Sequence, residues 1–342
     1  MRAIYITKFA ERDNLTFTED APKPELDLSS SDLLVRVLAC ALNPGDCRLM
    51  SGSVSLVMKP TKFPYIPGID LCGVVEAVSA KCQSSGKFKV GDRIIGSQDV
   101  FVHGSFAEYV VLNSDRAALA PPESICSDLE AASLPVAGCT AVQAIKDAQV
   151  GPRSRVLVIG GSGGVGSLVI QLAKLKGAAF LVQSLGADLA INYREANWWD
   201  MLKSDVDDHR LDVIIDCVGD DVSWRHCDND VLKKRRGKYI AVVDAPDTQV
   251  RTIVDLFKFL GSMMWKSMNP FTRSYKMVSS FPKSKELEEL AALVSEYPKH
   301  QFHAVLDTSS PYELSLESVE RAVALQTSQR AKGKLVFRVD EA

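Results

Sequence analysis

A glycine-rich loop between a buried strand and a helix constrains the fold of this chain more than any other segment. The stretch is "VLVIGGSGGVGSLVIQLAK", in which Gly161, Gly163 and Gly166 match G-x-G-x-x-G. The first glycine permits a tight turn, the second lets the backbone approach a pyrophosphate, and the third lets the helix pack closely on the strand. Free N–H groups at the helix N-terminus suit phosphate oxygens. The segment therefore predicts a dinucleotide-binding fold, with a ligand-free glycine turn as the alternative.

Two patterns of hydrophobic residues divide the chain near residue 124. Before that position, short apolar strands separated by Gly and Pro, such as "LLVRVLAC" and "GSFAEYVVL", indicate a β-rich domain. After it, apolar strands such as "RVLVIG" and "LDVIIDCV" alternate with amphipathic helices. Because parallel strands need such crossover connections, this part predicts an α/β fold with a doubly wound parallel sheet.

Composition and charge favour a small-molecule partner. The chain has 342 residues, 46% hydrophobic and 24% charged, as expected for two globular domains. A net charge of −3 gives no basic surface for nucleic acid. No apolar run is long enough to span a membrane, and the N-terminal stretch lacks the features of a signal or transit peptide. The cytoplasm is the expected compartment, with an organelle as the open alternative.

Several segments together resemble the medium-chain dehydrogenase/reductase superfamily over nearly the whole chain. They are "ALNPGDCRLMSG", "FPYIPGIDLCGVVEAVS", "FKVGDRIIG", "GSFAEYVVL", "ASLPVAGCTAVQAI" and "GGSGGVG". They are similar to the zinc-independent quinone oxidoreductase, or ζ-crystallin-like, branch, and residues 211–243 resemble its reticulon-4-interacting-protein group. The resemblance implies a GroES-like domain at 1–124, completed by about 278–342, and a Rossmann domain at 125–277.

The same resemblance argues against a catalytic metal. Zinc members carry a Cys ligand where Asn43 stands in "LNPGD" and a His ligand where Ile69 stands in "GIDLCG". A tetrahedral zinc site needs at least three such ligands, and the eight cysteines include no CxxC pair. We therefore expect no zinc. The cofactor that the resemblance implies is NADPH, with NADH as the alternative.

Asn43 and Thr140 are the candidate catalytic residues. The resemblance places both near the nicotinamide, and both side chains can hydrogen-bond a carboxamide or a carbonyl. The alternatives are a turn residue before Pro44 for Asn43 and, for Thr140, a helix residue that bonds to its own backbone. Without a Lewis acid, quinones and polarised C=C bonds are the favoured hydride acceptors. The implied cofactor-binding residues are Gly160, Gly161, Ser162, Gly163, Gly164, Val165, Gly166, Tyr193, Arg194, Cys217, Val218, Gly219, Val243 and Lys334.

The segment that follows the loop, "LAKLKGAAFLVQSLGADLAINYRE", is shorter than a complete dinucleotide half-site. Gly166 and Tyr193 are 27 positions apart, whereas a helix, a strand, a second helix and the connections to the next strand need roughly 35. The favoured alignment loses most of the second strand and its polar turn, roughly ten residues. The other makes "AAFLV" the strand and leaves no room for the second helix. In both, Tyr193 and Arg194 match family positions that touch the 2′-phosphate of NADPH, with an ordinary strand end as the alternative.

Three functional hypotheses follow. The leading one is an NADPH-dependent oxidoreductase that transfers hydride to a quinone or related enone. The second is an enoyl-thioester or alkenal reductase of the same fold. The third is a family member that has lost cofactor binding and works as an interaction protein, or a chain shortened by a gene-model error. The expected partner is a small-molecule substrate, and the oligomeric state stays open, with a homodimer as one option.

Overall fold

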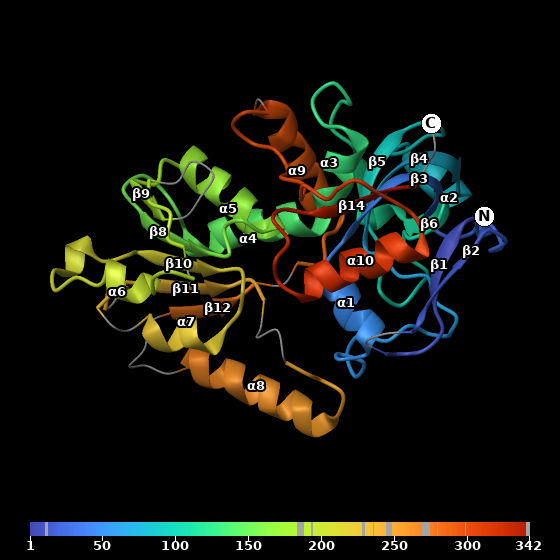
Figure 1. The fold of residues 1–342 in the computed structure, drawn as a ribbon. Helices are drawn as coiled ribbons and strands as arrows, with labels where there is room; N and C mark the ends of the chain where they lie inside the picture. Colours follow the sequence, from blue (N-terminus) through green and yellow to red (C-terminus); the bar gives the residue numbers. More distant parts are fainter. Residues whose placement is uncertain are drawn as a thin grey trace. The chain divides into compact units, whose positions relative to one another are not determined.

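The computed structural model describes most of the chain (Figure 1). The described residues are 1–10, 13–182, 188–192, 194–227, 230–234, 236–243, 248–268, 274–278, 280–297 and 299–339. The chain forms two compact units, one made of Met1–Cys139 with Phe281–Ala342 and the other of Thr140–Ser280. Within the described ranges, no helix is both long and apolar enough to cross a lipid bilayer.

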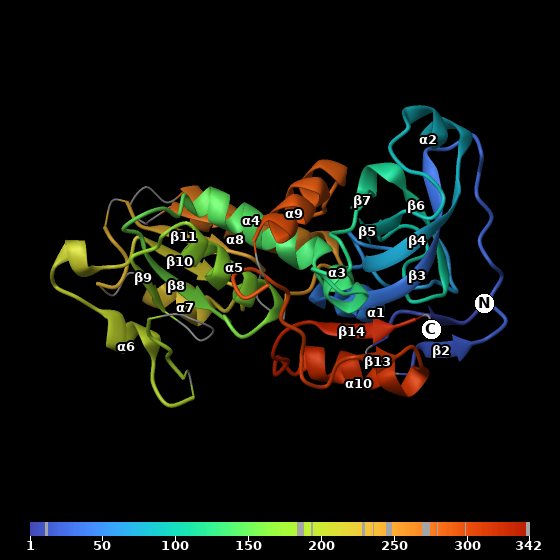
Figure 2. The ribbon, with the colours of Figure 1, turned by 90° about the horizontal axis from the view of Figure 1, so that it is seen from above.

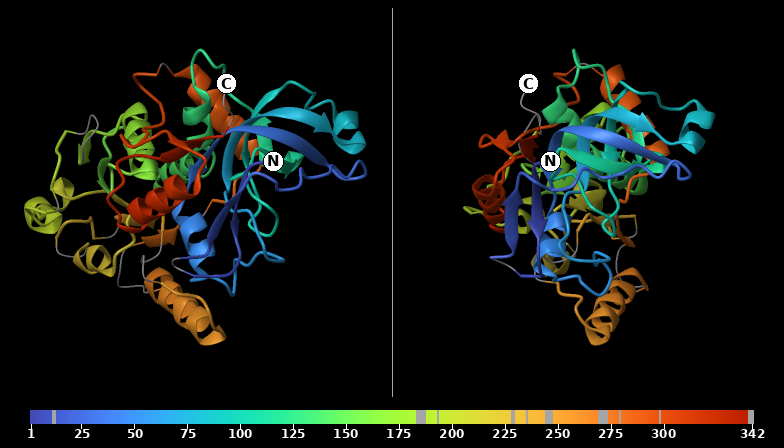
Figure 3. Two further views of the ribbon diagram at one scale, coloured as in Figure 1. Left: turned by 45° about the vertical axis from the view of Figure 1, so that its right-hand side comes forward. Right: turned by 90° about the vertical axis from the view of Figure 1, so that its right-hand side faces the viewer.

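The first unit is built on a mostly antiparallel sheet. Its strands follow the order β13-β14-β3-β4-β5-β7, and β6 also pairs with β3. β14 runs antiparallel to β3, with Leu335 opposite Leu42, so the end of the chain returns to an early strand (Figure 2). β1 and β2 form a separate two-stranded ribbon (Figure 3). The bounds are β1 Ala3–Ile6, β2 Leu15–Thr18, β3 Asp32–Leu42, β4 Asp70–Val78, β5 Arg93–Ser97, β6 Tyr109–Asn113, β7 Ala117–Leu119, β13 Tyr312–Glu313 and β14 Leu335–Arg338.

A hydrophobic core holds the early and late segments of this unit together. Leu33 and Val35 of β3 are fully buried in it. Phe106 packs against Phe337 of β14, with ring centroids 5.3 Å apart. Burial of such apolar side chains is the main favourable term in folding, so the C-terminal strand is an integral part of the unit. Its helices are α1 Pro44–Ser51, α2 Ala80–Ser85, α3 Asp128–Ser133, α9 Ser284–Glu296 and α10 Leu316–Thr327.

The boundary between the units falls inside one helix, α4 (Pro135–Ala148). The first unit extends to Cys139 because α3, which precedes α4, packs on β3 and β4. Gly138 of α4 also lies close to Leu290 of α9, so that an added Cβ would meet the Leu290 side chain at 2.6 Å. The start of α4 therefore packs with the β-rich unit.

The second unit is a parallel five-stranded sheet with the order β12-β11-β10-β8-β9. Helix α5 packs against β8 and β9, and α8 packs against β12. The expected α/β class, with a β-rich first unit and a parallel second sheet, is confirmed. The bounds are β8 Arg155–Ile159, α5 Gly164–Leu175, β9 Phe180–Val182, α6 Trp198–Leu202, β10 Val213–Asp216, α7 Asp221–His226, β11 Lys238–Ala241, α8 Ile253–Met268 and β12 Ser274–Met277.

The second strand of this sheet lies at the start of the shortened segment. β9 pairs in parallel with β8, with Phe180 opposite Arg155. β9 lies within "AAFLV", where the alternative alignment places the strand, so the favoured alignment is wrong about this strand. Residues 183–187, where a polar turn and a second helix would follow, lie outside the described residues. Residues 188–192 and 194–197, which are described, form no helix and no named strand. The strand expected to contain Tyr193 is therefore not formed by the described residues on either side of it. Tyr193 itself lies outside the described residues.

Candidate functional site

The glycine-rich loop joins β8 to α5 and includes all the predicted positions from Gly160 to Gly166. Gly160 has φ +75°, and the Gly163 N–H donates to its carbonyl oxygen at 3.0 Å. A Cβ atom on Gly166 would lie 2.3 Å from Gly160 O, and one on Gly163 would lie 3.3 Å from the same oxygen. Helix α5 has no side-chain cap at its N-terminus, so N–H groups of its first turn can bind an anion. The loop therefore fits a dinucleotide pyrophosphate.

The turn after β10 lies beside this loop. The side chain of Val218 approaches Gly160 so closely that an added Cβ there would be 2.9 Å from Val218 Cγ2. The Cys217 N–H donates to Ile159 O at 3.0 Å, and Gly219 has φ +83°. These residues follow the carboxyl end of a central parallel strand, where ligands bind in open α/β sheets. The structure thus brings the predicted Cys217, Val218 and Gly219 together with the glycine-rich loop.

A buried carboxylate fixes the conformation of that turn. Asp216 Oδ1 accepts hydrogen bonds from the N–H groups of Val218 at 2.9 Å and Gly219 at 3.0 Å. The Tyr239 hydroxyl donates to Asp216 Oδ2 at 2.6 Å. Burial raises the pKa of Asp216, although these three hydrogen bonds oppose the shift. Burial, together with the nearby carboxylate, also raises the pKa of Tyr239, so the phenol remains a donor.

A small pocket of about 10 Å³ opens beside this carboxylate. Trp224 packs edge-on against Tyr239 and Tyr275, with centroids 5.1 Å apart in both pairs. The predicted residue Val243 lies in its wall. The lining residues are Asp216, Gly219, Asp220, Trp224, Tyr239, Ala241, Val243, Lys266 and Tyr275. A tryptophan therefore stands beside the turn that borders the glycine-rich loop, which makes its fluorescence a local reporter.

Asn43 belongs to a buried polar cluster in the first unit. It follows β3 as the N-cap of α1, with Pro44 as the first helical residue. Its Nδ2 donates to Asp70 Oδ2 at 2.9 Å, and its Oδ1 accepts from Lys334 Nζ at 2.6 Å. Lys334 also donates to Leu42 O at 3.2 Å and lies 3.6 Å from Asp70 Oδ2. Because Asn43, Asp70 and Lys334 are 4%, 0% and 6% exposed, water screens these contacts little.

Asp46 completes this cluster. Its Oδ2 accepts the Asn43 backbone N–H at 2.8 Å, which stabilises the first turn of α1. Burial raises the pKa of Asp46 to about 7. Burial also raises the pKa of Asp70 and lowers that of Lys334, while their mutual attraction opposes both shifts. Asp46, expected from the sequence to be structural, is thus an ionisable group beside the candidate catalytic asparagine.

The remaining predicted residues fall in different places. Thr140 lies in α4 at the start of the second unit and is 5% exposed. Arg194 is exposed, and its backbone N–H donates to Asn192 Oδ1 at 3.2 Å. Lys334, expected near the cofactor, makes its described contacts with Leu42, Asn43 and Asp70 of the first unit. The roles of these three residues toward a cofactor stay predictions.

Three buried polar residues were not found from the sequence: Asp70, Asp216 and Tyr239. Asp216 closes the apolar strand "VIID", and Asp70 opens the strand "DLCGVVEAV". A carboxylate directly next to a buried apolar run is costly unless it is hydrogen-bonded. That cost was a usable signal for both aspartates, whereas nothing in the local pattern singles out Tyr239.

The donor set is a poor match for zinc. In the described parts of the chain, no group of three or more His, Cys, Asp or Glu side chains could hold a metal ion. Asn43 uses its amide in the cluster above, and Ile69 offers no ligand atom. The residues at the positions of the family's zinc ligands therefore do not fit that metal.

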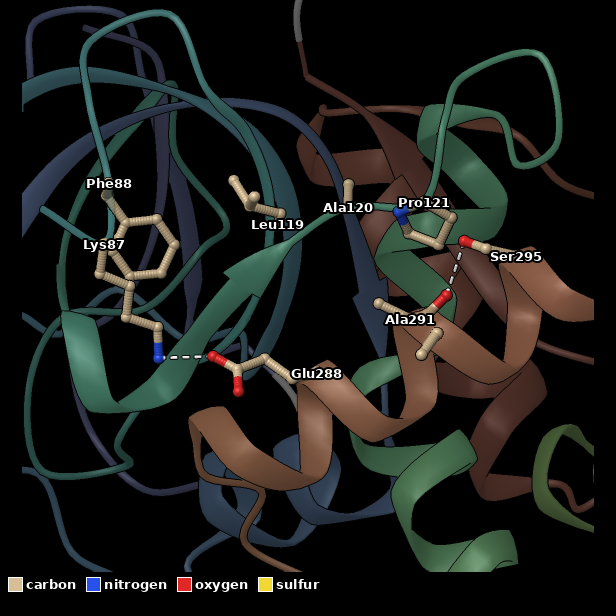
Figure 4. A pocket seen from close by; sticks show the side chains of 9 residues that line it. Lys87, Phe88, Leu119, Ala120, Pro121, Glu288, Ala291 and Ser295 are labelled. Atoms are coloured by element: carbon tan, nitrogen blue, oxygen red, sulfur yellow. Dashed lines mark hydrogen bonds and ion pairs between the residues drawn. The ribbon is translucent and has the colours of Figure 1, made fainter.

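The first unit also carries a larger groove of about 330 Å³, between β7 and α9 (Figure 4). The Lys87–Glu288 ion pair, 2.7 Å long, lies at one end, and most of the other lining side chains are apolar. The lining residues are Lys87, Phe88, Leu119, Ala120, Pro121, Glu288, Ala291, Ala292 and Ser295. None of them is a predicted site residue, so this groove is separate from the residues discussed above.

Comparison with known families matches parts of both units. Residues 29–122 match the alcohol dehydrogenase GroES-like domain, and residues 185–337 match a family described as zinc-binding dehydrogenase. The solved quinone oxidoreductase of Coxiella burnetii is 29% identical, with a TM-score of 0.78 over 99% of both chains. These matches define a medium-chain dehydrogenase/reductase fold.

Curated relatives narrow the family further. The chloroplastic quinone-oxidoreductase QR1 of Triphysaria versicolor is 30% identical over 322 residues, or 89% of each chain. The chloroplastic NADPH-dependent alkenal/one oxidoreductase of Arabidopsis thaliana is 31% identical over 81% of this chain and 70% of its own length. The 2-methylene-furan-3-one reductase of Solanum lycopersicum is 34% identical over 64% of this chain, and the match spans 57% of that protein. The chain belongs to the medium-chain dehydrogenase/reductase superfamily of oxidoreductases, in its quinone oxidoreductase-like group.

Proposed function

We propose that this protein is an NADPH-dependent oxidoreductase that transfers hydride to a quinone or a related enone without zinc. The observation that carries the proposal is the close packing of the loop Gly160–Gly166, where a Cβ on Gly166 would lie 2.3 Å from Gly160 O. Only a glycine backbone permits that approach, and the uncapped first turn of α5 could then bind a phosphate group. When bound, NADPH supplies the hydride.

Within this proposal, the chain's own residues bind and orient the reactants. The N–H groups of the first turn of α5 would hold the pyrophosphate. Cys217, Val218 and Gly219, fixed by Asp216, would form a wall of the crevice, and Thr140 would bind the nicotinamide end. Arg194 and Tyr193 would meet the 2′-phosphate, and because Arg194 is exposed, that contact would be weak.

The substrate class is proposed from the relatives and from the donor set. Relatives carry names for quinone, alkenal/one and furanone reduction, and all these substrates accept hydride at a polarised C=C or quinone system. Asn43 and Ile69 stand where zinc-dependent members of the family carry ligands, and neither side chain suits zinc. The proposed substrates are therefore ones that accept hydride without a metal to polarise a carbonyl. Asn43 would instead hydrogen-bond the substrate or the nicotinamide carboxamide.

The test is a titration of the purified protein with NADPH and NADH, followed by tryptophan fluorescence, together with rates for a quinone, an alkenone and a crotonyl thioester. We expect saturable NADPH binding and a higher kcat/KM for the quinone or alkenone than for the thioester. Absence of NADPH binding in folded protein would overturn the proposal. A preference for the thioester would reassign the substrate class.

A further inference from the structure

Asn43, Asp70 and Lys334 come from three distant parts of the chain and meet at one buried point. Asn43 follows β3, Asp70 begins β4, and Lys334 directly precedes β14. The backbone of Lys334 is fixed on both sides, because its N–H donates to Val305 O at 2.8 Å and its carbonyl accepts from Asp307 at 2.9 Å. The fold therefore fixes the backbone from which the ammonium extends, and the contacts of Nζ with Leu42 O, Asn43 Oδ1 and Asp70 Oδ2 place its end.

The two ends of the Asn43 amide face opposite charges. Oδ1 accepts from the Lys334 ammonium at 2.6 Å, and Nδ2 donates to the Asp70 carboxylate at 2.9 Å. A flipped amide would place its NH₂ group against an ammonium and its oxygen against a carboxylate. Both contacts would be repulsive in a site that water screens little. Asp70 is itself held, since its Oδ1 accepts the Val136 N–H at 3.1 Å.

We propose that Asp70 and Lys334 are positioning residues that lock the Asn43 carboxamide in the single orientation needed for hydride transfer. This rests on the proposed function. Lys334 acts through Asn43 and does not bind the cofactor directly. An amide oxygen has two lone pairs, and Lys334 uses one of them, so the other can accept an N–H or O–H of the cofactor or substrate. The adjacent ammonium also draws electron density from the amide, which strengthens Nδ2 as a donor.

The test is a double-mutant cycle with Asn43→Ala, Lys334→Met and the combined variant. We expect kcat for the quinone to fall about 10- to 100-fold in each single variant, as for a misplaced catalytic group. The combined variant should be no slower than Asn43→Ala alone, since Lys334 has nothing to act on without the amide. The dissociation constant for NADPH should change less than about 3-fold in all three.

Two further measurements complete the test: a variant in which the buried ion pair is removed as a whole, and a readout that does not depend on activity. Asp70→Asn combined with Lys334→Met removes both charges of the pair together, so that the Asp70 carboxylate is not left buried without its cation. This variant should fold and still show the fall in kcat. The side-chain amide signal of Asn43, followed by NMR in asparagine-labelled protein without cofactor, should shift when Lys334 is replaced. Lys276→Met, which removes an exposed partner of Asp147, is the control and should change neither readout.

The outcomes separate the two proposals. Additive losses of kcat in the combined variant, or a large loss of NADPH affinity in Lys334→Met, would assign Lys334 a direct role and overturn the positioning proposal alone. Full kcat in the folded Asp70→Asn/Lys334→Met variant would do the same. A wild-type protein that neither binds NADPH nor reduces the quinone would overturn the proposed function, and the positioning role with it.

Discussion

The hydroxyl of Tyr239 donates a 2.6 Å hydrogen bond to Asp216 Oδ2, while Asp216 Oδ1 accepts the N–H groups of Val218 and Gly219. One side chain on β11 therefore supports, through a carboxylate on β10, the turn that packs against the glycine-rich loop. A Cβ on Gly160 would lie only 2.9 Å from Val218 Cγ2, so the turn and the glycine-rich loop are in close contact. A small movement of the turn would therefore change the shape of the proposed cofactor crevice.

Tyr239→Phe removes this hydrogen bond with little change of shape. We expect the free energy of unfolding to fall by about 1–3 kcal/mol, because a buried acceptor loses its partner. NADPH affinity should fall about 3- to 10-fold as the turn loosens. Urea unfolding and Trp fluorescence titration measure the two effects. The control is Tyr312→Phe, which removes a hydroxyl bonded to Ser309 Oγ in the first unit and should leave affinity unchanged. Wild-type affinity in Tyr239→Phe would contradict the proposed coupling.

Gly166→Ala should abolish NADPH binding. The added Cβ would stand 2.3 Å from Gly160 O, a backbone atom that cannot yield without moving the loop. The matched control is Gly261→Ala in α8, where an added Cβ meets nothing within 4 Å and should stabilise the helix by up to about 1 kcal/mol. Circular dichroism checks the fold, and calorimetry measures binding. A folded Gly166→Ala protein that binds NADPH normally would remove this loop from the site.

Asp46 predicts a pH dependence of stability. Its pKa rises from 3.8 to about 7 on folding, so between these values the folded state holds a proton that the unfolded state has lost. The contribution of Asp46 to stability should therefore fall as pH rises from about 4 to about 7, by up to about 1.4 kcal/mol per pH unit. Asp46→Asn should remove that contribution and flatten the curve obtained from urea unfolding at several pH values. Parallel curves for the two proteins would show that folding does not raise the pKa of Asp46, and would contradict the prediction.

The shortened segment after α5 should weaken discrimination between NADPH and NADH. Arg194 is exposed, so its contact with a 2′-phosphate would be screened by water. We expect a smaller preference for NADPH than in full-length relatives, and lower affinity for both cofactors. Since Phe180–Val182 already pairs with β8, a relative's polar turn and second helix should be inserted after Val182 to restore both properties. The measurement is the dissociation constants of NADPH and of NADH for the unmodified protein and for the protein with the insertion. Strong discrimination between the two cofactors by the unmodified protein would contradict the prediction.

Zinc should be absent from the purified enzyme. Asn43 and Ile69 stand where the family's metal ligands stand, and neither is a zinc ligand. Elemental analysis should find far less than one zinc per chain, and a chelator should leave quinone reduction intact. One tightly held zinc per chain, together with loss of activity on its removal, would contradict this prediction.

Local patterns in the sequence were enough to predict the class of fold. The apolar strand, the glycine spacing and the following helix lie within about twenty residues, and each glycine has a steric role that can be stated without a structure. The β-rich first part and the parallel second sheet likewise follow from hydrophobic periodicity and from the short runs between Gly and Pro. These features depend on residues that are close together in the chain, so they can be predicted from one sequence.

The tertiary structure decided the features that depend on distant pairing. The sequence left two alignments for the second strand, and only the pairing of Phe180–Val182 with β8 chose between them. The Asn43–Lys334 hydrogen bond joins residues 291 positions apart, and no local pattern predicts such a contact. Asp216 and Tyr239 meet because their strands are neighbours in the sheet. The loop can be read from the sequence because its geometry is local, whereas the polar groups around the candidate site become partners only when separate strands are brought together by a shared core.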